Sequence, residues 1–185
     1  MSVLTEALPV SVEVEGRRYP INSDYRVCLR IMEAFEDDTL TNEEKQLVML
    51  RLLYKDVPPN VAGACEAAMN FLNGWTTAAG NDDGTRRYSF SKDARYIFTG
   101  VLQTHGMDLE KIEYLHWWKF CYLFMDLRED CFFSRLIYYR TRLEKGNLTQ
   151  EEREYCDSIR DILDLPKPPE DTTVEDEFMR LLRGG

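Results

Sequence analysis

Residues 115–124 read Leu-His-Trp-Trp-Lys-Phe-Cys-Tyr-Leu-Phe, and this stretch decides what kind of fold the chain can form. At helical spacing it sets apolar or aromatic side chains on every side of one helix. An ordinary surface helix carries a single apolar stripe about 100° wide, with charged residues opposite. The helix is therefore either the centre of a core, or a core helix that also shows a hydrophobic face to partner proteins.

The direction of each ring follows from its place on this helix. Trp117 and Trp118 are neighbours, so their side chains point about 100° apart and cannot share one seam. We expect Trp118 and Phe120 to lie mainly in the core. Trp117 or Tyr122 should then lean towards a partner protein. Together with Phe124, these rings are the partner-binding residues that we predict here, because aromatic side chains anchor protein interfaces well.

The N-terminal segment predicts a short β-hairpin over residues 8–21. Val10, Val12 and Val14 alternate with polar residues, and a Glu-Gly turn leads to a second extended run. Two strands alone are marginally stable, so the hairpin must lie on a helical body or pair with a strand of another chain. This exposed edge, together with the surplus of aromatic residues, predicts that the protein self-associates.

Helix start signals mark the rest of the chain. Thr41–Glu44 and Thr149–Glu152 have the form of capping boxes, in which a threonine hydroxyl and a glutamate carboxylate each accept a backbone N–H. Asp24 and Asp108 stand where they can cap helices, the second of them the aromatic helix. With apolar residues at helical spacing between such signals, the sequence predicts a mainly α fold: a compact bundle of about six or seven helices with a short N-terminal β-hairpin.

We expect a single helical domain over residues 1–165, followed by a Pro-rich, acidic tail over residues 166–185. Such a composition predicts an extended and flexible tail. Phe178, Leu181 and Leu182 nevertheless stand at the i, i+3, i+4 spacing of a helix face. They either form a short motif that binds a partner or belong to a frayed terminus.

The charge balance limits the classes of partner. The formal net charge is −10 and the pI is near 4.8. Sequence-independent nucleic-acid binding needs a surplus of Lys and Arg facing phosphates, so we expect no nucleic-acid partner. No apolar run reaches the roughly 20 residues of a membrane span, and the first residues lack the basic start of a signal peptide. We therefore expect a cytoplasmic protein that does not bind membranes.

No group of residues in the sequence indicates catalysis or metal binding. The five cysteines include no C-x-x-C pair and no close histidine, which argues against a disulfide framework or a zinc site. His105 stands at a predicted helix end and His116 among aromatic residues, and the common hydrolase and phosphate-binding motifs are missing. We expect a protein that is not an enzyme and uses no cofactor or metal.

A set of motifs runs through most of the chain. The most specific is the Leu-His-Trp-Trp-Lys-Phe run at residues 115–120. The others are Leu8-Pro9, Ile21-Asn22-Ser23-Asp24-Tyr25-Arg26, Tyr88-x-Phe90-x-x-Asp93-x-x-Tyr96-Ile97, Gly106-Met107-Asp108-Leu109 and Tyr139-Arg140. Together they resemble the fifteenth-gene-product family of long-tailed phages that infect Gram-positive bacteria. The resemblance covers roughly residues 8–160 and leaves out the Pro-rich tail.

This resemblance implies a role in phage tail assembly. Such proteins look like tail assembly chaperones, which coat the long helical tape measure protein, keep it soluble and bring tail tube subunits to it. The implied partners are the tape measure protein and the tail tube protein. The implied location is the host cytoplasm, with the protein absent from the mature virion. The rival interpretation is a structural head-tail connector or tail-completion protein that stays in the particle.

Overall fold

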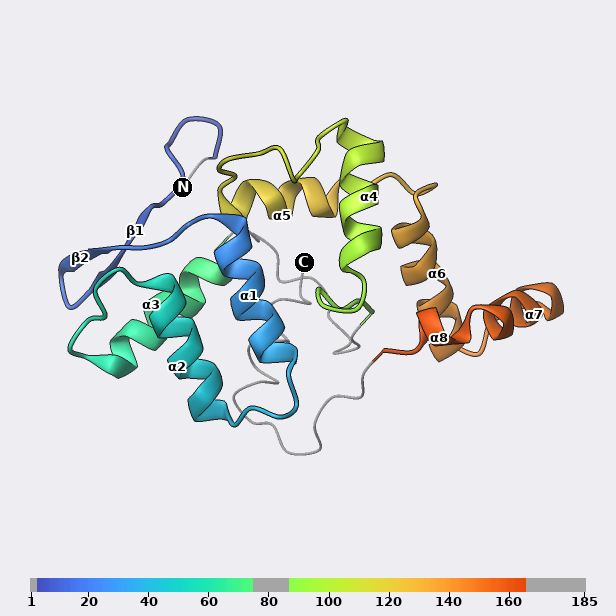
Figure 1. Cartoon of the computed structure of the whole chain (residues 1–185), viewed down its shortest axis with the longest axis horizontal. Coiled ribbons are helices and arrows are strands. Elements are labelled where there is room, and N and C mark those ends of the chain that lie inside the picture. The colour runs from blue at the N-terminus through green and yellow to red at the C-terminus, as the bar shows by residue number, and fades with distance from the viewer. Residues whose placement is uncertain (1–2, 75–86, 166–185) are drawn as a thin grey trace. The chain divides into compact units, whose positions relative to one another are not determined.

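The computed structural model describes residues 3–74 and 87–165, which form helices and one hairpin (Figure 1). The elements, in chain order, are β1 (Ser11–Val14), β2 (Arg17–Pro20), α1 (Tyr25–Glu36), α2 (Asn42–Leu53), α3 (Val61–Asn73), α4 (Ala94–His105), α5 (Trp117–Met125), α6 (Phe132–Glu144), α7 (Gln150–Ser158) and α8 (Arg160–Leu163). This part of the chain is mainly α with an N-terminal antiparallel hairpin, which confirms the predicted fold class.

The described residues hold eight helices, where the sequence predicts about six or seven. The additional helix comes from a break in a run that the sequence predicts as continuous. Ile159, with φ of −118° and ψ of 22°, ends α7 and precedes α8. These angles lie outside the helical range, so the last four residues form a separate turn.

The chain divides into two compact units. Among the described residues, unit 1 consists of residues 3–74 and 113–122, and unit 2 consists of residues 87–112 and 123–165. The division falls inside α5, so the first part of that helix belongs to unit 1 and its end to unit 2. The single helical domain expected over residues 1–165 stays a prediction, and the tail at 166–185 lies outside the described residues.

The two predicted capping boxes and the predicted cap at Asp24 form as expected. Thr41 accepts the Glu44 N–H at 3.3 Å, and the Glu44 carboxylate accepts the Thr41 N–H at 2.8 Å. Thr149 and Glu152 make the same reciprocal pair before α7. The Asp24 carboxylate caps α1. Each cap satisfies a backbone donor that a helix start leaves unpaired, and is worth about 1 kcal/mol.

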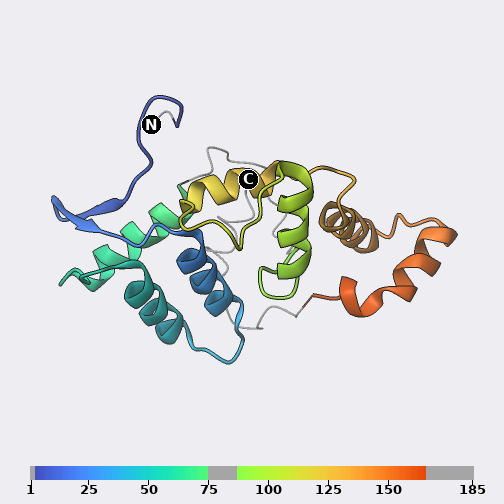
Figure 2. The same ribbon diagram turned by 45° about the horizontal axis from the view of Figure 1, so that its top comes forward.

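In unit 1, α1 packs on α2, α2 on α3, and the hairpin lies along α3 (Figures 1 and 2). The hairpin can approach α3 closely because Gly63 has no side chain. A Cβ at Gly63 would lie only 3.1 Å from a methyl group of Val14, which is 5% exposed. The hairpin therefore rests on the helical body, which is one of the two arrangements that the sequence allows.

The aromatic helix begins later than predicted. Asp108 does not cap it, because its carboxylate accepts a backbone N–H in a local turn and α5 starts only at Trp117. Residues 115–117 instead pair with residues 23–25 through an antiparallel bridge, in which the N–H groups of Tyr25 and Trp117 each donate at 2.8 Å. This bridge holds residues 115 and 116 extended, so the helix cannot start before it.

Candidate functional site

Both tryptophans of the aromatic segment bind the C-terminal end of α3. The indole N–H of Trp117 donates to the Leu72 carbonyl at 2.9 Å, and that of Trp118 donates to the Phe71 carbonyl at 2.8 Å. These carbonyls belong to the last turn of α3, where a helix runs out of N–H groups, although the Phe71 carbonyl also accepts the Gly74 N–H at 3.2 Å. The two indoles thus cap α3 from another segment. We call these four residues the tryptophan junction.

Two polar side chains connect the tryptophan junction to the N-terminal part of unit 1. Asp24, besides capping α1, accepts the Leu115 N–H at 3.2 Å. The Nε2 of His116 lies 2.9 Å from the Pro9 carbonyl, and its Nδ1 accepts the Trp118 N–H at 3.1 Å. These partners require the neutral ring with its proton on Nε2. Burial lowers the pKa of His116, which favours the same neutral form, so His116 is a hydrogen-bonded core residue.

The predicted partner-binding rings at the start of α5 lie in the interior. Trp117 is 0%, Phe120 1% and Trp118 7% exposed. Phe120 stacks on Tyr25 and on Trp117, with ring centroids 5.0 and 5.8 Å apart. Trp118 and Phe120 thus lie in the core, as expected, and Trp117 lies there too, which leaves Tyr122 as the ring of the expected pair that can lean towards a partner. The two neighbouring indoles bind adjacent carbonyls at one helix end. Two side chains that point about 100° apart can therefore both lie in the core.

The end of α5 belongs to a different core. Phe124 is 6% exposed and lies in unit 2, where its ring centroid is 5.1 to 5.5 Å from those of Tyr88, Phe90 and Phe133. Tyr122, between the two groups, is half-buried. The helix is therefore apolar on all sides because it supplies side chains to the cores of both units.

The remaining residues predicted to bind a partner are not in the described part. Phe178, Leu181 and Leu182 lie in the tail, outside the described residues. Partner binding through the whole predicted set therefore stays a prediction. Within α5 itself, burial leaves little aromatic surface for it.

Crowding at the tryptophan junction gives a first testable prediction. A Cβ at Gly74 would lie 2.5 Å from Cζ2 of Trp118 and 2.8 Å from the Asn70 carbonyl, so Gly74→Ala should destabilise the protein by about 1–3 kcal/mol. Gly100, inside α4, is the matched control: its Cβ would make ordinary contacts of 3.4 Å with Leu127. Gly100→Ala should stabilise by about 0.5–1 kcal/mol through helix propensity. Urea midpoints that shift in the same direction for both variants would contradict the crowding.

Unit 2 contains a buried ion pair that the sequence analysis missed. Asp93 is 0% and Arg140 8% exposed, and two N···O distances of 2.6 and 2.9 Å make the pair bidentate. The guanidinium also donates to the carbonyls of Arg87, Ile162 and Leu163 at 2.8 to 3.1 Å. All five guanidinium donors are therefore bonded, and the pair ties α6 to the start of α4 and to α8.

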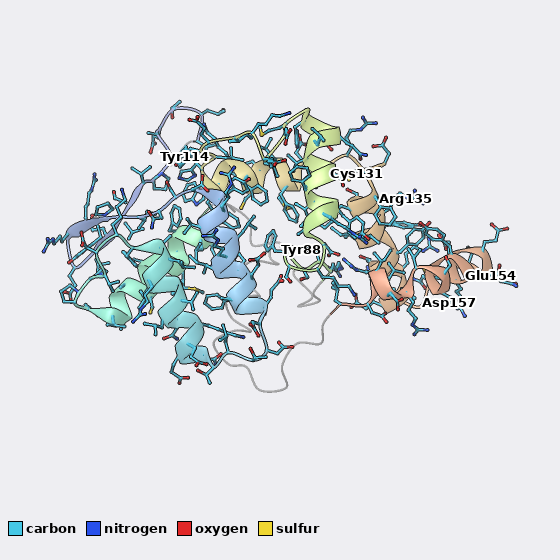
Figure 3. All side chains as sticks on the ribbon, in the orientation of Figure 1. Tyr88, Tyr114, Cys131, Arg135, Glu154 and Asp157 are labelled. Atoms are coloured by element: carbon cyan, nitrogen blue, oxygen red, sulfur yellow. The ribbon has the colours of Figure 1, made fainter. Side chains whose placement is uncertain are left out.

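Exposed apolar side chains are the part of the described surface that can make apolar contacts. In the described part of unit 1, the exposed aromatic residue is Tyr114 (Figure 3), which is 55% exposed. Its hydroxyl lies 2.8 Å from Ser23 Oγ. In unit 2, Tyr138 is 47% exposed. The other exposed large apolar residues are Val3, Leu4, Val10, Leu47, Val57, Val61, Leu102, Met125 and Leu143.

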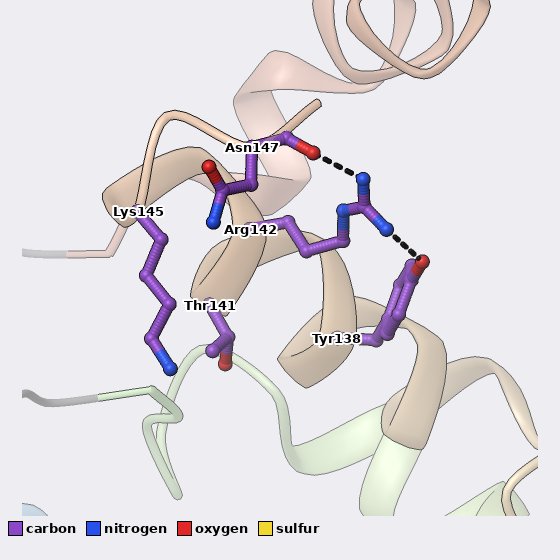
Figure 4. A pocket seen from close by; sticks show the side chains of 5 residues that line it. All are labelled: Tyr138, Thr141, Arg142, Lys145 and Asn147. Carbon is purple, nitrogen blue, oxygen red and sulfur yellow. Dashed lines mark hydrogen bonds between the residues drawn. The ribbon is translucent and has the colours of Figure 1, made fainter. Parts of the chain in front are cut away.

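A pocket beside the C-terminal half of α6 is lined by Tyr138, Thr141, Arg142, Lys145 and Asn147 (Figure 4). The guanidinium of Arg142, one of the lining residues, already binds other groups of the protein. Arg142 donates to the Tyr138 hydroxyl at 2.7 Å and to the Asn147 carbonyl, and lies 3.1 Å from the Glu152 carboxylate. Because these contacts use the Arg142 charge inside the protein, the pocket is a structural feature of the α6–α7 connection.

The chemistry of the described residues is that of a packed interior. Burial raises the pKa of the Cys28 and Cys121 thiols, so they stay protonated and are poor nucleophiles. Within residues 3–74 and 87–165, no group of three or more His, Cys, Asp or Glu side chains could hold a metal ion. None of the helices in these ranges is long and apolar enough to cross a membrane.

Comparison with models of known protein families gives a match over most of the chain. Residues 4–165 match the family model described as Bacteriophage Gp15 protein, so the match includes the tryptophan junction and the Asp93–Arg140 pair. It confirms the resemblance to the fifteenth-gene-product family at the level of the family. No curated protein and no solved structure matches the chain. The family indicates a phage structural or morphogenesis protein.

Proposed function

Because this chain belongs to the Bacteriophage Gp15 protein family, we propose that it acts in phage tail morphogenesis as an assembly chaperone. It binds the tape measure protein and brings tail tube subunits to it, without catalysis and without a cofactor. The family match over residues 4–165 carries the proposal. A net charge of −10 supports it, because an acidic protein stays soluble while its apolar side chains contact a helical client.

The client contact uses exposed apolar side chains instead of the buried rings of α5. Tyr114 and Tyr138 each keep about half of their surface open, at 55% and 47%. Tyrosine combines a large apolar ring with a polar tip and is frequent among the residues that dominate interface energies. Each copy makes a modest contact, and many copies along one filament supply the total affinity through avidity.

Coexpression of the full chain with the tape measure protein of the same phage tests this function. We expect more of the tape measure protein in the soluble fraction, and recovery of the two proteins as a complex that also captures tail tube subunits. Moderate salt should leave the complex intact because its contact is mainly apolar. A tape measure protein that is equally soluble when expressed alone would contradict the chaperone role.

Tyr114→Ala is expected to weaken tape measure binding by about 30-fold while the protein stays folded, because the ring is exposed and its removal opens no cavity. Tyr114→Phe keeps the ring, loses only the bond to Ser23 and should bind like the wild type. Tyr138→Ala is the corresponding variant in unit 2. Binding by isothermal titration calorimetry that is unchanged in both alanine variants would exclude these tyrosines as anchors.

The rival role, a connector or tail-completion protein, predicts a different location for the chain. An assembly chaperone leaves the finished particle, whereas a connector stays in it at a fixed copy number. Quantitative mass spectrometry of purified virions separates the two. Depletion of the chain relative to tail tube protein supports the chaperone, and a constant small number of copies supports the connector.

A further inference from the structure

In the N-terminal hairpin, the backbone N–H and C=O groups of successive residues point alternately towards the paired strand and away from it. The two-residue turn at Glu15–Gly16 has φ values of 51° and 76°, which is the mirror-image turn that joins antiparallel strands closely. The register sets Val14 opposite Arg17 beside this turn. Residues that flank such a turn exchange both backbone hydrogen bonds, and the pattern alternates from there. The backbone N–H and C=O groups of Ser11 and Glu13 therefore point away from β2.

The outer edge of β1 is open. Within the described residues, no other segment makes a backbone hydrogen bond to Ser11 or Glu13. The outer edge of β2 differs, because Pro20 has no N–H, its carbonyl accepts the Lys55 N–H at 3.4 Å, and the chain after it bridges to the end of α2. Within the described residues, the outer edge of β2 is thus closed at Pro20, which leaves Arg18 as its one outward-facing residue, whereas the outer edge of β1 keeps two and can accept a strand.

We propose that two copies of this chain pair antiparallel through their β1 edges and form one continuous four-stranded sheet. In this pairing, Ser11 of each copy lies opposite Glu13 of the other, and the two Val12 residues face each other at the two-fold axis. The inference rests on the hairpin alone and does not depend on the role in tail assembly.

Of the possible registers between the two β1 strands, the one centred on Val12 avoids unfavourable contacts that the adjacent registers would create. Outward residues must stay opposite outward residues, so the strands can shift only in steps of two. A step one way sets Glu13 opposite Glu13, and like charges directly opposite destabilise a strand pair. A step the other way sets Glu13 opposite Pro9, which has no N–H. The register centred on Val12 avoids both, sets a serine beside each carboxylate and pairs two β-branched side chains.

A second copy fits this edge because the edge is complementary to itself. A two-fold axis at Val12 makes each donor of one copy meet an acceptor of the other, as isologous contacts require. The edge is also short, with four residues in β1, and carries the exposed Glu13 carboxylate. Both features limit strand pairing with unrelated chains. The dimer is therefore weak and reversible.

Disulfide cross-linking of the full chain tests the register. Val12→Cys places two thiols on a directly opposed pair with a Cα separation of about 4.5 Å, which suits a disulfide. Val10→Cys is the matched control: Val10 is 58% exposed, yet the two copies of this residue would stand about 13 Å apart. After mild oxidation with copper phenanthroline, we expect covalent dimers from Val12→Cys only, with the wild-type chain reporting any contribution of the native cysteines. Equal or stronger cross-linking of Val10→Cys would overturn the register.

Sedimentation velocity over a concentration series tests the edge itself. Ser11→Pro removes an outward N–H and no bond inside the hairpin, so it should abolish concentration-dependent dimers while the circular dichroism spectrum stays that of the wild type. Ser11→Ala loses the same hydroxyl but keeps the N–H and should still dimerise. A wild-type chain that stays monomeric up to about 1 mM, or a Ser11→Pro variant that dimerises like Ser11→Ala, would overturn the proposal.

Discussion

Trp117→Ala is expected to lower the free energy of unfolding by about 3–5 kcal/mol, a large share of the roughly 5–15 kcal/mol that stabilise a typical domain. The indole is 0% exposed, stacks on Phe120 and donates to the Leu72 carbonyl at 2.9 Å. Alanine would leave a cavity where the ring was, and would leave that carbonyl unpaired at the end of α3. Urea unfolding followed by circular dichroism measures the loss.

Two controls separate the contributions to this loss. Trp117→Phe keeps an aromatic ring but removes the N–H, so it should cost about 1–3 kcal/mol, the penalty of a buried carbonyl without a partner. Tyr114→Ala removes an exposed ring close in sequence and should change stability by about 0.5 kcal/mol or less. If Trp117→Ala unfolds at the wild-type urea concentration, the ring is not a core residue and the partner-facing interpretation of Trp117 returns.

The sequence predicted the local parts of the fold. The capping boxes at Thr41–Glu44 and Thr149–Glu152 were identified correctly because each signal lies within four residues and acts on the backbone beside it. The hairpin at the N-terminus was found for the same reason, since its turn and its alternating valines are adjacent. Such features need no knowledge of what packs against them.

The residues that surround the aromatic segment could not be predicted from local sequence signals. Helical periodicity gives the direction of a ring but not the neighbour that it meets, and the neighbours of Trp117 and Trp118 are carbonyls about 45 residues earlier in the chain. The start of α5 was misplaced for a related reason. Asp108 is a plausible local cap, yet the bridge between residues 23–25 and 115–117 fixes where the helix begins.

The position of Asp93 before a helix suggests a local capping role, and this obscures its pairing with a residue far along the chain. Asp93 stands just before α4 and therefore looks like a helix cap, although its side chain makes no cap bond. Its carboxylate accepts the Ser89 N–H at 3.0 Å and binds Arg140, which is 47 positions away. Asp93 lies in the Tyr88–Ile97 motif and Arg140 in the Tyr139-Arg140 motif, but nothing in one sequence links the two residues to each other.

Asp93→Asn is expected to lower the free energy of unfolding by about 3–5 kcal/mol, because it leaves the Arg140 charge buried without its counter-ion. The amide has nearly the shape of the carboxylate, so the loss reports charge and hydrogen bonding instead of packing. Arg140→Gln should cost a similar amount. Urea unfolding of both single variants and the double variant gives the coupling energy, and we expect the double variant to lose less than the sum of the single losses.

An apolar double variant distinguishes the ion pair from the wider role of Arg140. Buried ion pairs can often be replaced by apolar residues of similar volume with little loss, because two desolvated charges disappear together. Here the guanidinium also binds three backbone carbonyls, those of Arg87, Ile162 and Leu163. Asp93→Leu/Arg140→Met removes both charges but takes the guanidinium donor from one buried and two partly buried carbonyls, so it should remain destabilised by several kcal/mol. Wild-type stability in this variant would mean that Arg140 only neutralises Asp93, and that the three carbonyls find other donors.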